Sequence, residues 1–221
     1  MFKKQMLAQK IVCYLALAAA VFLFIATIGM STDLYQILYP CVSKALGEEM
    51  GLDGAYEYVK GASVYLDIQP FNMLAVRLAL ALIVISLLSF VAGTNRRRKY
   101  YLFNYIATAV ICIAFIAVAT YVLSQVLYWK NEFLTGVDFD SESKKSLVNF
   151  AASTLGKARG VIYDKSTLWL DINIVATVVV LVTSVLYLLN SVWKFILCRA
   201  EDKLLQQSAS QLSLDNGGNV Q

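Results

Sequence analysis

Two ionisable residues lie beside or inside stretches of the chain that otherwise carry no charge. Asp33 follows the uncharged run at residues 11–30, and Arg77 is the only charge in the run at residues 73–92. A charge in hydrocarbon is costly and is usually paired or hydrated. We therefore predict a structural ion pair between Asp33 and Arg77. The alternative is that Arg77 extends its long side chain to the outer membrane surface.

The chain lacks the residue sets of the common catalytic and metal sites. It contains no histidine, and its four cysteines show no C-x-x-C spacing. Histidine is the commonest proton shuttle and metal ligand, and structural zinc sites use closely spaced cysteines. The aspartates Asp67 and Asp171 are suited to cap the first turn of a membrane helix. We therefore predict that the protein is not an enzyme and that it binds no metal and no cofactor.

A basic cluster, "RRRK", occupies a tight turn between two apolar runs. Arg96, Arg97, Arg98 and Lys99 place four positive charges within residues 94–100, where there is no acid. This pattern predicts a turn held on the cytoplasmic side, in contact with anionic lipid headgroups. We expect no nucleic-acid binding, because the chain has no basic domain to support it.

Four long apolar segments must position these residues. The chain is 59% hydrophobic with a mean hydropathy of +0.63, which is high for a soluble domain. Crossing about 30 Å of hydrocarbon takes about 20 helical residues, and a helix satisfies its own backbone there. We therefore predict an all-α integral membrane protein, a four-helix transmembrane bundle. The predicted spans are residues 11–30, 72–93, 101–123 and 172–193.

Charge assigns the connections to the two sides of the membrane. The loops at 31–71 and 124–171 contain eight Lys or Arg and twelve Asp or Glu, whereas the head, the basic turn and the tail contain ten Lys or Arg. Short basic flanks stay in the cytoplasm. We therefore predict a multi-pass protein of the plasma (cytoplasmic) membrane with both termini cytoplasmic. The polar cytoplasmic tail, residues 198–221, is expected to continue the last helix at first and to end in disorder.

Two short sequence echoes indicate an internal repeat. "LYQILY" at 34–39 returns as "LSQVLY" at 123–128, an offset of 89 residues, and "VYLDIQ" at 64–69 returns as "LWLDIN" at 168–173, an offset of 104. Both echoes fall beside predicted spans, so we predict a tandem, parallel duplication of a span–outer loop–span unit. The alternative is chance similarity between apolar sequences. The repeats are residues 1–93 and 101–197, joined by the turn at 94–100.

The repeat has two consequences for the first span. Its alanine-rich run and the preceding Lys3 and Lys4 also resemble a secretory signal peptide. The equivalent third span must cross the membrane, so we expect the first helix to be retained. Small residues allow close helix approach, and we expect the alanine-rich first and third spans to pack near the bundle axis, with the second and fourth outside.

The two outer loops are predicted to form short helices that pack into a cap. Pro40 should end or restart the first helix, and residues 53–66 are expected to form a short helix that returns to the membrane. In the second loop, Leu147, Phe150 and Leu155 fall on one face of a helix.

No motif in the chain assigns a reaction or a transported substrate. The spans contain few polar groups and no Gly or Pro interruption at the midplane. Transporters usually have polar or charged residues along the bundle interior, or helices broken at mid-membrane. We therefore predict a non-catalytic scaffold, sensor or accessory subunit of a membrane complex, with recognition by its outer helical cap. The alternative is a small transporter or channel that acts as an oligomer. The lipid bilayer is one expected partner, other membrane proteins are candidate partners, and the oligomeric state stays open.

Overall fold

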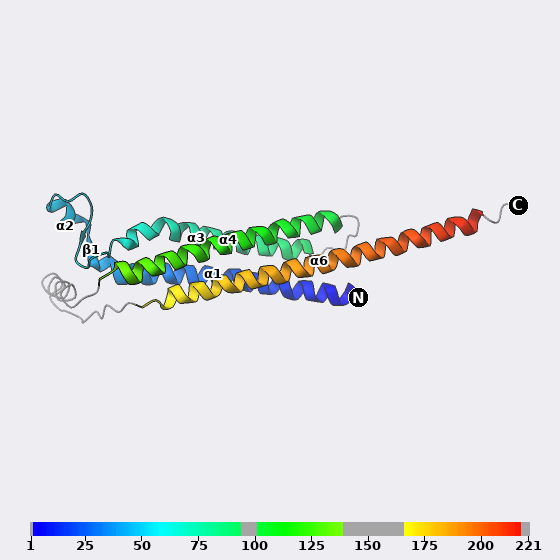
Figure 1. Cartoon of the computed structure of the whole chain (residues 1–221), viewed down its shortest axis with the longest axis horizontal. Coiled ribbons are helices and arrows are strands. Elements are labelled where there is room, and N and C mark those ends of the chain that lie inside the picture. The colour runs from blue at the N-terminus through cyan, green and yellow to red at the C-terminus, as the bar shows by residue number, and fades with distance from the viewer. Residues whose placement is uncertain (1, 94–100, 139–165, 218–221) are drawn as a thin grey trace.

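Four long helices run side by side and form an elongated bundle (Figure 1). The computed structural model describes residues 2–93, 101–138 and 166–217. All four long helices are long and apolar enough to cross a membrane, which confirms the predicted helical, multi-pass class. The long helices are α1 (Phe2–Leu38), α3 (Val64–Gly93), α4 (Tyr101–Gly136) and α6 (Leu168–Gly217).

The helices continue past the predicted spans. α1 runs on to Leu38, just before Pro40, and α4 runs on to Gly136. α6 passes through the predicted tail as far as Gly217, and its last part extends beyond the other three helices (Figure 1). Residues 199–216 contain helix-favouring Ala, Leu, Lys, Glu and Gln and no proline or glycine. The helix therefore does not end where the apolar sequence ends, and the expected disorder is not found before Gly217.

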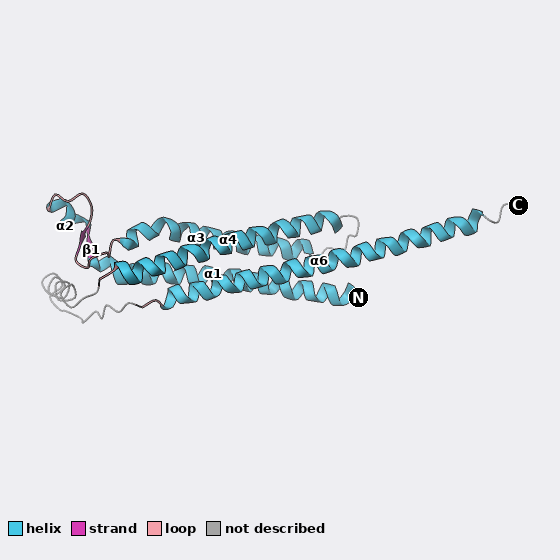
Figure 2. Ribbon diagram, in the orientation of Figure 1, coloured by secondary structure: helices cyan, strands magenta, loops and turns pink. Residues whose placement is uncertain are grey.

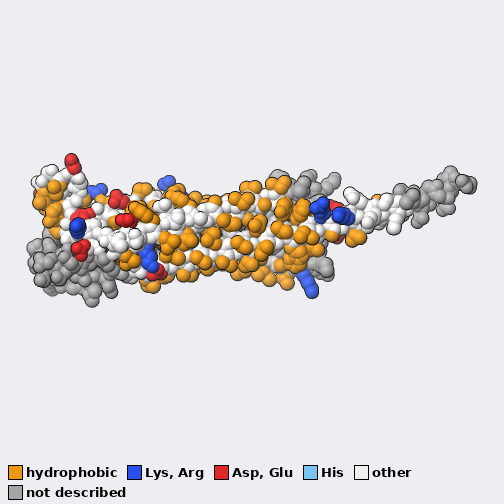
Figure 3. Space-filling view, viewed as in Figure 1, with side chains coloured by type: hydrophobic (Ala, Val, Ile, Leu, Met, Phe, Trp, Pro, Cys, Tyr) orange, Lys and Arg blue, Asp and Glu red, His pale blue; other side chains and the backbone are white. Residues whose placement is uncertain are grey.

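The two ends of the bundle differ. We call the end that carries residues 39–63 the loop end, and the opposite end, where α1 begins, the terminal end (Figure 1). On the face shown in Figure 3, hydrophobic side chains cover the middle of the bundle, and charged side chains gather mostly toward its two ends. This distribution is the one expected of a protein whose middle lies in hydrocarbon.

The order of the helices around the bundle differs from the expected one. α1 packs against α3 and α6, and α4 packs against α6 and more loosely against α3. The alanine-rich helices α1 and α4 therefore lie at opposite corners, and the expectation that they pack together at the axis is wrong. At Gly29, the absence of a side chain lets α1 approach α6 closely. A Cβ added at Gly29 of α1 would lie 2.1 Å from the Trp169 ring of α6.

A fully buried polar contact also joins α1 to α6. Asn173 donates from Nδ2 to Thr27 Oγ1 at 3.1 Å, and the Thr27 hydroxyl in turn donates to the Leu23 carbonyl at 2.8 Å. Thr177 donates to the backbone carbonyl of Asn173 at 2.7 Å. Hydrogen bonds of this kind hold membrane helices together where lipid supplies no hydrophobic drive.

Apolar side chains fill the space between the helices. Leu23, Leu82, Val122 and Val180, one from each long helix, are each at most 1% exposed and belong to one continuous core. Van der Waals contact in such a core is a main source of cohesion between helices in a membrane. The described part of one copy is therefore a packed bundle.

The first loop forms a short antiparallel hairpin that encloses one six-residue helix. After α1 comes the 3₁₀ turn η1 (Tyr39–Cys41), followed by β1 (Val42–Ser43), α2 (Lys44–Glu49) and β2 (Tyr56–Glu57), with β1 and β2 antiparallel (Figure 2). The helix expected at 53–66 is not formed, because α3 begins only at Val64. Gly54 and Gly61 have φ of 133° and 80°, values that end helical propagation. The helix expected in the second loop lies outside the described residues.

The first loop is fixed to α3 and to the end of α4. The Glu57 carboxylate accepts hydrogen bonds from the Gly61 N–H at 2.6 Å and the Ser63 N–H at 2.9 Å, just before α3. Asp138 donates its N–H to the Lys60 carbonyl at 2.9 Å. A Cβ at Gly61 would lie 2.1 Å from the backbone oxygen of Gly136. The loop therefore lies directly on the end of α4.

Candidate functional site

The predicted ion pair between Asp33 and Arg77 is not formed. Among the described residues, opposite charges approach within 4.0 Å at Lys130 and Asp171 but not at Asp33 and Arg77. Arg77 is exposed and lies on the same stripe of α3 as the exposed Met73 and Leu80, whereas Asp33 is half-buried on α1. The two charges lie on neighbouring helices whose rotation keeps them apart.

Arg77 instead lines a surface groove between α1 and α3 near the loop end. Two adjoining hollows of about 280 and 430 Å³ share Ser31, Gln69 and Asn72 in their linings. We call this surface the α1–α3 groove. Asp33 lines neither hollow. The polar lining of the groove consists of Ser31, Thr32, Gln36, Gln69, Asn72 and Arg77.

Asn72 is the most constrained residue of the α1–α3 groove. Its side chain is only 6% exposed, and its Oδ1 has no hydrogen-bond partner. Leaving a buried acceptor unsatisfied costs about 1–3 kcal/mol. The amide therefore has an unmet need for a hydrogen-bond donor, and it lines both hollows.

Pro70 lies inside α3, between the groove residues Gln69 and Asn72. Proline has no N–H, so it cannot bond the carbonyl of Leu66 four residues earlier, and its ring disturbs the preceding turn. Membrane helices tolerate such a break where nearby polar groups compensate for it. The proline therefore removes one backbone hydrogen bond of α3 beside the groove.

Three tyrosines mark the level of the groove along the bundle. Tyr35 and Tyr39 stack with ring centroids 4.7 Å apart, and Tyr65 meets both rings edge-on, at 6.2 and 6.3 Å. Tyr35 and Tyr65 also line the smaller hollow. Tyrosines of membrane proteins concentrate at the headgroup level. The groove therefore lies close to a membrane surface.

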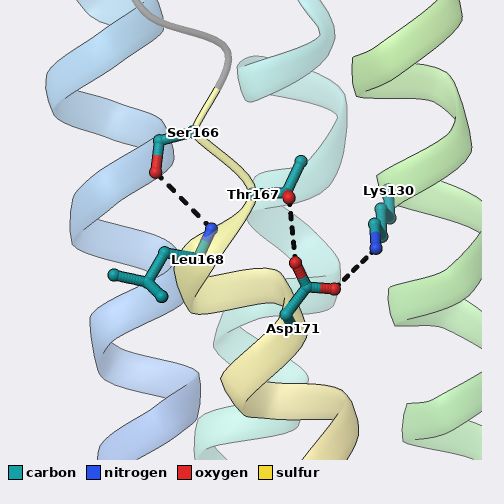
Figure 4. A network of polar contacts seen from close by, with 5 residues as sticks. All are labelled: Lys130, Ser166, Thr167, Leu168 and Asp171. Atoms are coloured by element: carbon teal, nitrogen blue, oxygen red, sulfur yellow. Dashed lines mark hydrogen bonds and ion pairs between the residues drawn. The ribbon is translucent and has the colours of Figure 1, made fainter.

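A separate ion pair at the loop end connects α4 to α6 (Figure 4). Lys130 Nζ donates to Asp171 Oδ1 at 2.5 Å, and the Thr167 hydroxyl donates to Asp171 Oδ2 at 2.9 Å. Asp171 lies in the first turn of α6, where a carboxylate also offsets the helix dipole. Both carboxylate oxygens are thus occupied, and we interpret this network as a structural connection.

The terminal end holds a second buried polar cluster. Gln5 and Asn190 each have a buried side-chain oxygen without a partner. A cavity of about 20 Å³ lies against Gln9, Asn190 and Lys194. That volume holds about one water molecule. A single bound water can therefore satisfy Asn190.

The described residues contain no group of three His, Cys, Asp or Glu side chains that could hold a metal ion. All four cysteines are buried thiols that form no disulfide. The predicted contact of Arg96, Arg97, Arg98 and Lys99 with anionic lipid lies outside the described residues.

The comparisons with known proteins give no match. Neither a family model, nor a curated protein, nor a solved structure is similar to this chain. The function must therefore be argued from the α1–α3 groove, the loop end and the packing between helices.

Sequence reasoning selected Arg77 but missed Asn72 and the pairing of Lys130 with Asp171. Lys130 directly follows the aromatic pair at 128–129, and Asp171 directly precedes a predicted span, so the sequence places both charges near one membrane surface. That common level was the available signal for the pair. Asn72 gave no comparable signal, because a lone Asn at the edge of a predicted span is ordinary.

Proposed function

We propose that this protein is a non-catalytic scaffold, sensor or accessory subunit of a membrane complex and recognises its partner at the loop end. The observation that carries the proposal is an apolar tip on an ordered loop. Met50 and Leu52 are 56% and 50% exposed on the turn that follows α2. Exposed apolar groups of this kind, rimmed by charge, are typical of contact surfaces. The acids Glu48 and Asp53 flank the tip.

The loop end has the support that a recognition surface needs. The turn bearing the tip is held by the β1–β2 pairing, and Ser43 caps α2 by accepting the Leu46 N–H at 3.1 Å. Glu57 and the contact of Gly61 with Gly136 attach the other side of the loop to the bundle. A held loop loses less conformational entropy on binding than a free one.

The packed core supports a binding role over conduction by a single copy. Polar groups on α1 and α6 at Thr27, Asn173 and Thr177 are satisfied by one another or by backbone. A conduction path would instead need polar groups facing an open interior.

We also infer that the bundle arose by duplication of one α-helical hairpin. α3 begins at Val64 and α6 at Leu168, which is the same 104-residue offset as the sequence echo at these positions. The paired helices α1 and α4 lie at opposite corners, as do α3 and α6. That arrangement is expected of two parallel repeats about a pseudo-two-fold axis.

Site-specific photocrosslinking tests recognition at the loop end. A benzoylphenylalanine at Leu52 should yield a discrete adduct with another protein in native membranes. The matched control is the same substitution at Leu205 of α6, which is similarly exposed but lies on the extension at the other end. Equal adduct yields from the two positions, or no protein adduct from Leu52, would refute the proposal.

The proposed orientation, with cytoplasmic termini in the plasma membrane, has its own test. Asp53→Cys at the loop tip should react with a membrane-impermeant maleimide on intact cells, and Ser208→Cys on α6 should react only after lysis. The four native cysteines are buried, so the background should be low. The reverse labelling pattern would overturn the orientation.

A further inference from the structure

The α1–α3 groove lies where the apolar sequence of both its helices begins or ends. Ser31 directly follows the apolar run at 11–30, and Asn72 directly precedes the run at 73–92. Hydrocarbon in a bilayer is about 30 Å thick, which these runs of 20 helical residues match. The groove therefore faces the boundary between hydrocarbon and headgroups on the loop-end side.

Arg77 brings a cation to this boundary and has no protein anion beside it. No carboxylate of the described residues lies within 4.0 Å of its guanidinium. Side chains on a helix point toward its N-terminus, which for α3 is the loop end, so Arg77 is directed back along α3 toward the loop end. Gln69 and Asn72 lie on that side of it, and all three residues line the larger hollow. A guanidinium with amide donors nearby is suited to bind a phosphate oxygen pair.

An apolar stripe continues from this cation toward the middle of the membrane. Met73, Arg77, Leu80 and Val84 follow one another at helical spacings of three and four residues, so they share one face of α3. Met73, Leu80 and Val84 are each half-exposed on the outside of the bundle. Arg77 thus lies near the loop end of an exposed apolar stripe on α3. Such a stripe is suited to contact lipid acyl chains.

The buried amide specifies the headgroup further. Asn72 Oδ1 lacks a donor, and the protein supplies none. An ethanolamine or glycerol headgroup carries N–H or O–H donors, whereas the quaternary ammonium of choline carries none. Phospholipids with an ethanolamine or glycerol headgroup therefore carry both a phosphate that can bind Arg77 and a hydrogen-bond donor that can bind Asn72.

The corresponding positions of the second half of the chain lack these features. At the 104-residue offset, Asn72 corresponds to Ala176 and Arg77 to Leu181, while Pro70 corresponds to Ile174. The second half therefore lacks the arginine, the buried asparagine and the proline of the α1–α3 groove. Packing alone, which both halves need, does not require it.

We propose that the α1–α3 groove binds one phospholipid of the loop-end leaflet, with its phosphate on Arg77, a donor of its ethanolamine or glycerol headgroup on Asn72, and its acyl chains along Leu80 and Val84. The proposal does not depend on the partner of the loop tip, nor on which side of the membrane the loop end faces.

Native mass spectrometry of the full-length protein in detergent tests the lipid site. Palmitoyl-oleoyl phosphatidylethanolamine or phosphatidylglycerol should give a one-lipid adduct at concentrations at least tenfold lower than the phosphatidylcholine with the same chains. Arg77→Leu, which installs the residue found at the equivalent position 181, should weaken that adduct by at least tenfold. Arg199→Leu removes an exposed arginine of α6 and is the matched control, with no expected change.

Asn72→Leu separates the headgroup contact from the phosphate contact. This variant should still bind lipid through Arg77 but should lose the preference for ethanolamine and glycerol over choline. Glycerol 3-phosphate, which has the headgroup chemistry without acyl chains, should compete only at concentrations at least a hundredfold higher than the lipid.

Four results would overturn the proposal. Two concern selectivity: Arg77→Leu binds lipid as well as wild type does, or wild type binds the choline lipid as tightly as the ethanolamine and glycerol lipids. The other two are competition by glycerol 3-phosphate at concentrations similar to those of the lipid, and a protein crosslinked at Met73 in native membranes. The last result would assign the groove to a partner helix. Folding of each variant is checked beforehand by a single size-exclusion peak and by protection of the buried cysteines from maleimide.

Discussion

The contact between Gly29 and Trp169 predicts that a single methyl group can disturb the α1–α6 interface. An added Cβ at Gly29 would lie 2.1, 2.3 and 2.5 Å from three ring atoms of Trp169, where ordinary contacts begin at 3.4 Å. The indole must therefore move by more than 1 Å, or the two helices must separate. Overpacking of this kind costs about 1–3 kcal/mol.

Gly136→Ala supplies the matched control for Gly29→Ala. The nearest atom to a Cβ at Gly136 is the Glu132 Oε2, 3.8 Å away, which is ordinary van der Waals contact, so the methyl group causes no collision. Gly29 lies inside α1, so its substitution by alanine gains up to about 1 kcal/mol of helix propensity, whereas Gly136 is the last residue of α4 and gains less. We expect the collision, about 1–3 kcal/mol, to outweigh this gain and to leave Gly29→Ala less stable than Gly136→Ala.

The assay can use thiols that the chain already contains. All four cysteines are buried thiols that form no disulfide, so a fluorogenic maleimide should report unfolding in SDS titrations from mixed micelles. In a Trp169→Leu background the flat ring is gone, and Gly29→Ala should cost nothing or stabilise the protein. If Gly29→Ala and Gly136→Ala unfold alike, or if Trp169→Leu fails to relieve the difference, the close packing of α6 on α1 is refuted.

Three further predictions concern the other contacts between segments. A double-mutant cycle of Lys130→Met and Asp171→Asn should give a coupling of about 0.2–1 kcal/mol that weakens with added salt, because the pair is part-exposed; a coupling independent of salt would contradict this. Gly61→Ala should cost about 2 kcal/mol or more, from a φ of 80° and the collision with Gly136, and should speed proteolysis within residues 39–63; unchanged proteolysis would contradict the contact of the loop with α4. Asn173→Ala should lower the unfolding free energy by only about 1 kcal/mol, because both neighbouring hydroxyls keep a backbone acceptor; a loss above about 4 kcal/mol would be too large for the observed bonds.

The number and type of the long elements could be predicted from sequence because hydrocarbon imposes a length. An uncharged run of 20 residues can satisfy its backbone in a bilayer only as a helix. The helix ends were less predictable. The sequence after Met30 and that after residue 193 change from apolar to polar without proline or glycine, so the helices continue where the apolar composition stops.

The neighbours of each helix could not be predicted, because helices that are apolar all round carry no marked face. Alanine content predicted that α1 packs closely, which it does, but could not say that α6 is its main neighbour. The same lack of rotational information explains the unformed pair of Asp33 and Arg77. An ion pair requires that both side chains lie at a similar depth and also face each other across the α1–α3 interface. Arg77 instead lies on the exposed stripe of α3.

The loop of residues 39–63 illustrates a different limit. The glycines that interrupt a helix in this loop are evident in the sequence. The hydrogen-bond acceptors that hold the loop in place depend on tertiary contact. The Glu57 carboxylate accepts hydrogen bonds from the N–H groups of Gly61 and Ser63, four and six residues later in the chain. These bonds take the place of the helical backbone hydrogen bonds expected there. Arg77 was therefore the one residue of the α1–α3 groove that the sequence identified. The other residues of the groove could not be identified, because they depend on how α1 and α3 pack together.

The length of α6 has a mechanical consequence. Fifty residues in one uninterrupted helix span about 75 Å, more than twice the thickness of the hydrocarbon. Its first turn is tied to α4 by Asp171, and its last turn stands clear of the bundle (Figure 1). A rigid rod of this length acts as a lever: a tilt of about 5° about its first turn would move the far tip sideways, perpendicular to the helix axis, by roughly 6 Å. A change of helix angle at the loop end would therefore displace the far tip beyond the terminal end of the bundle.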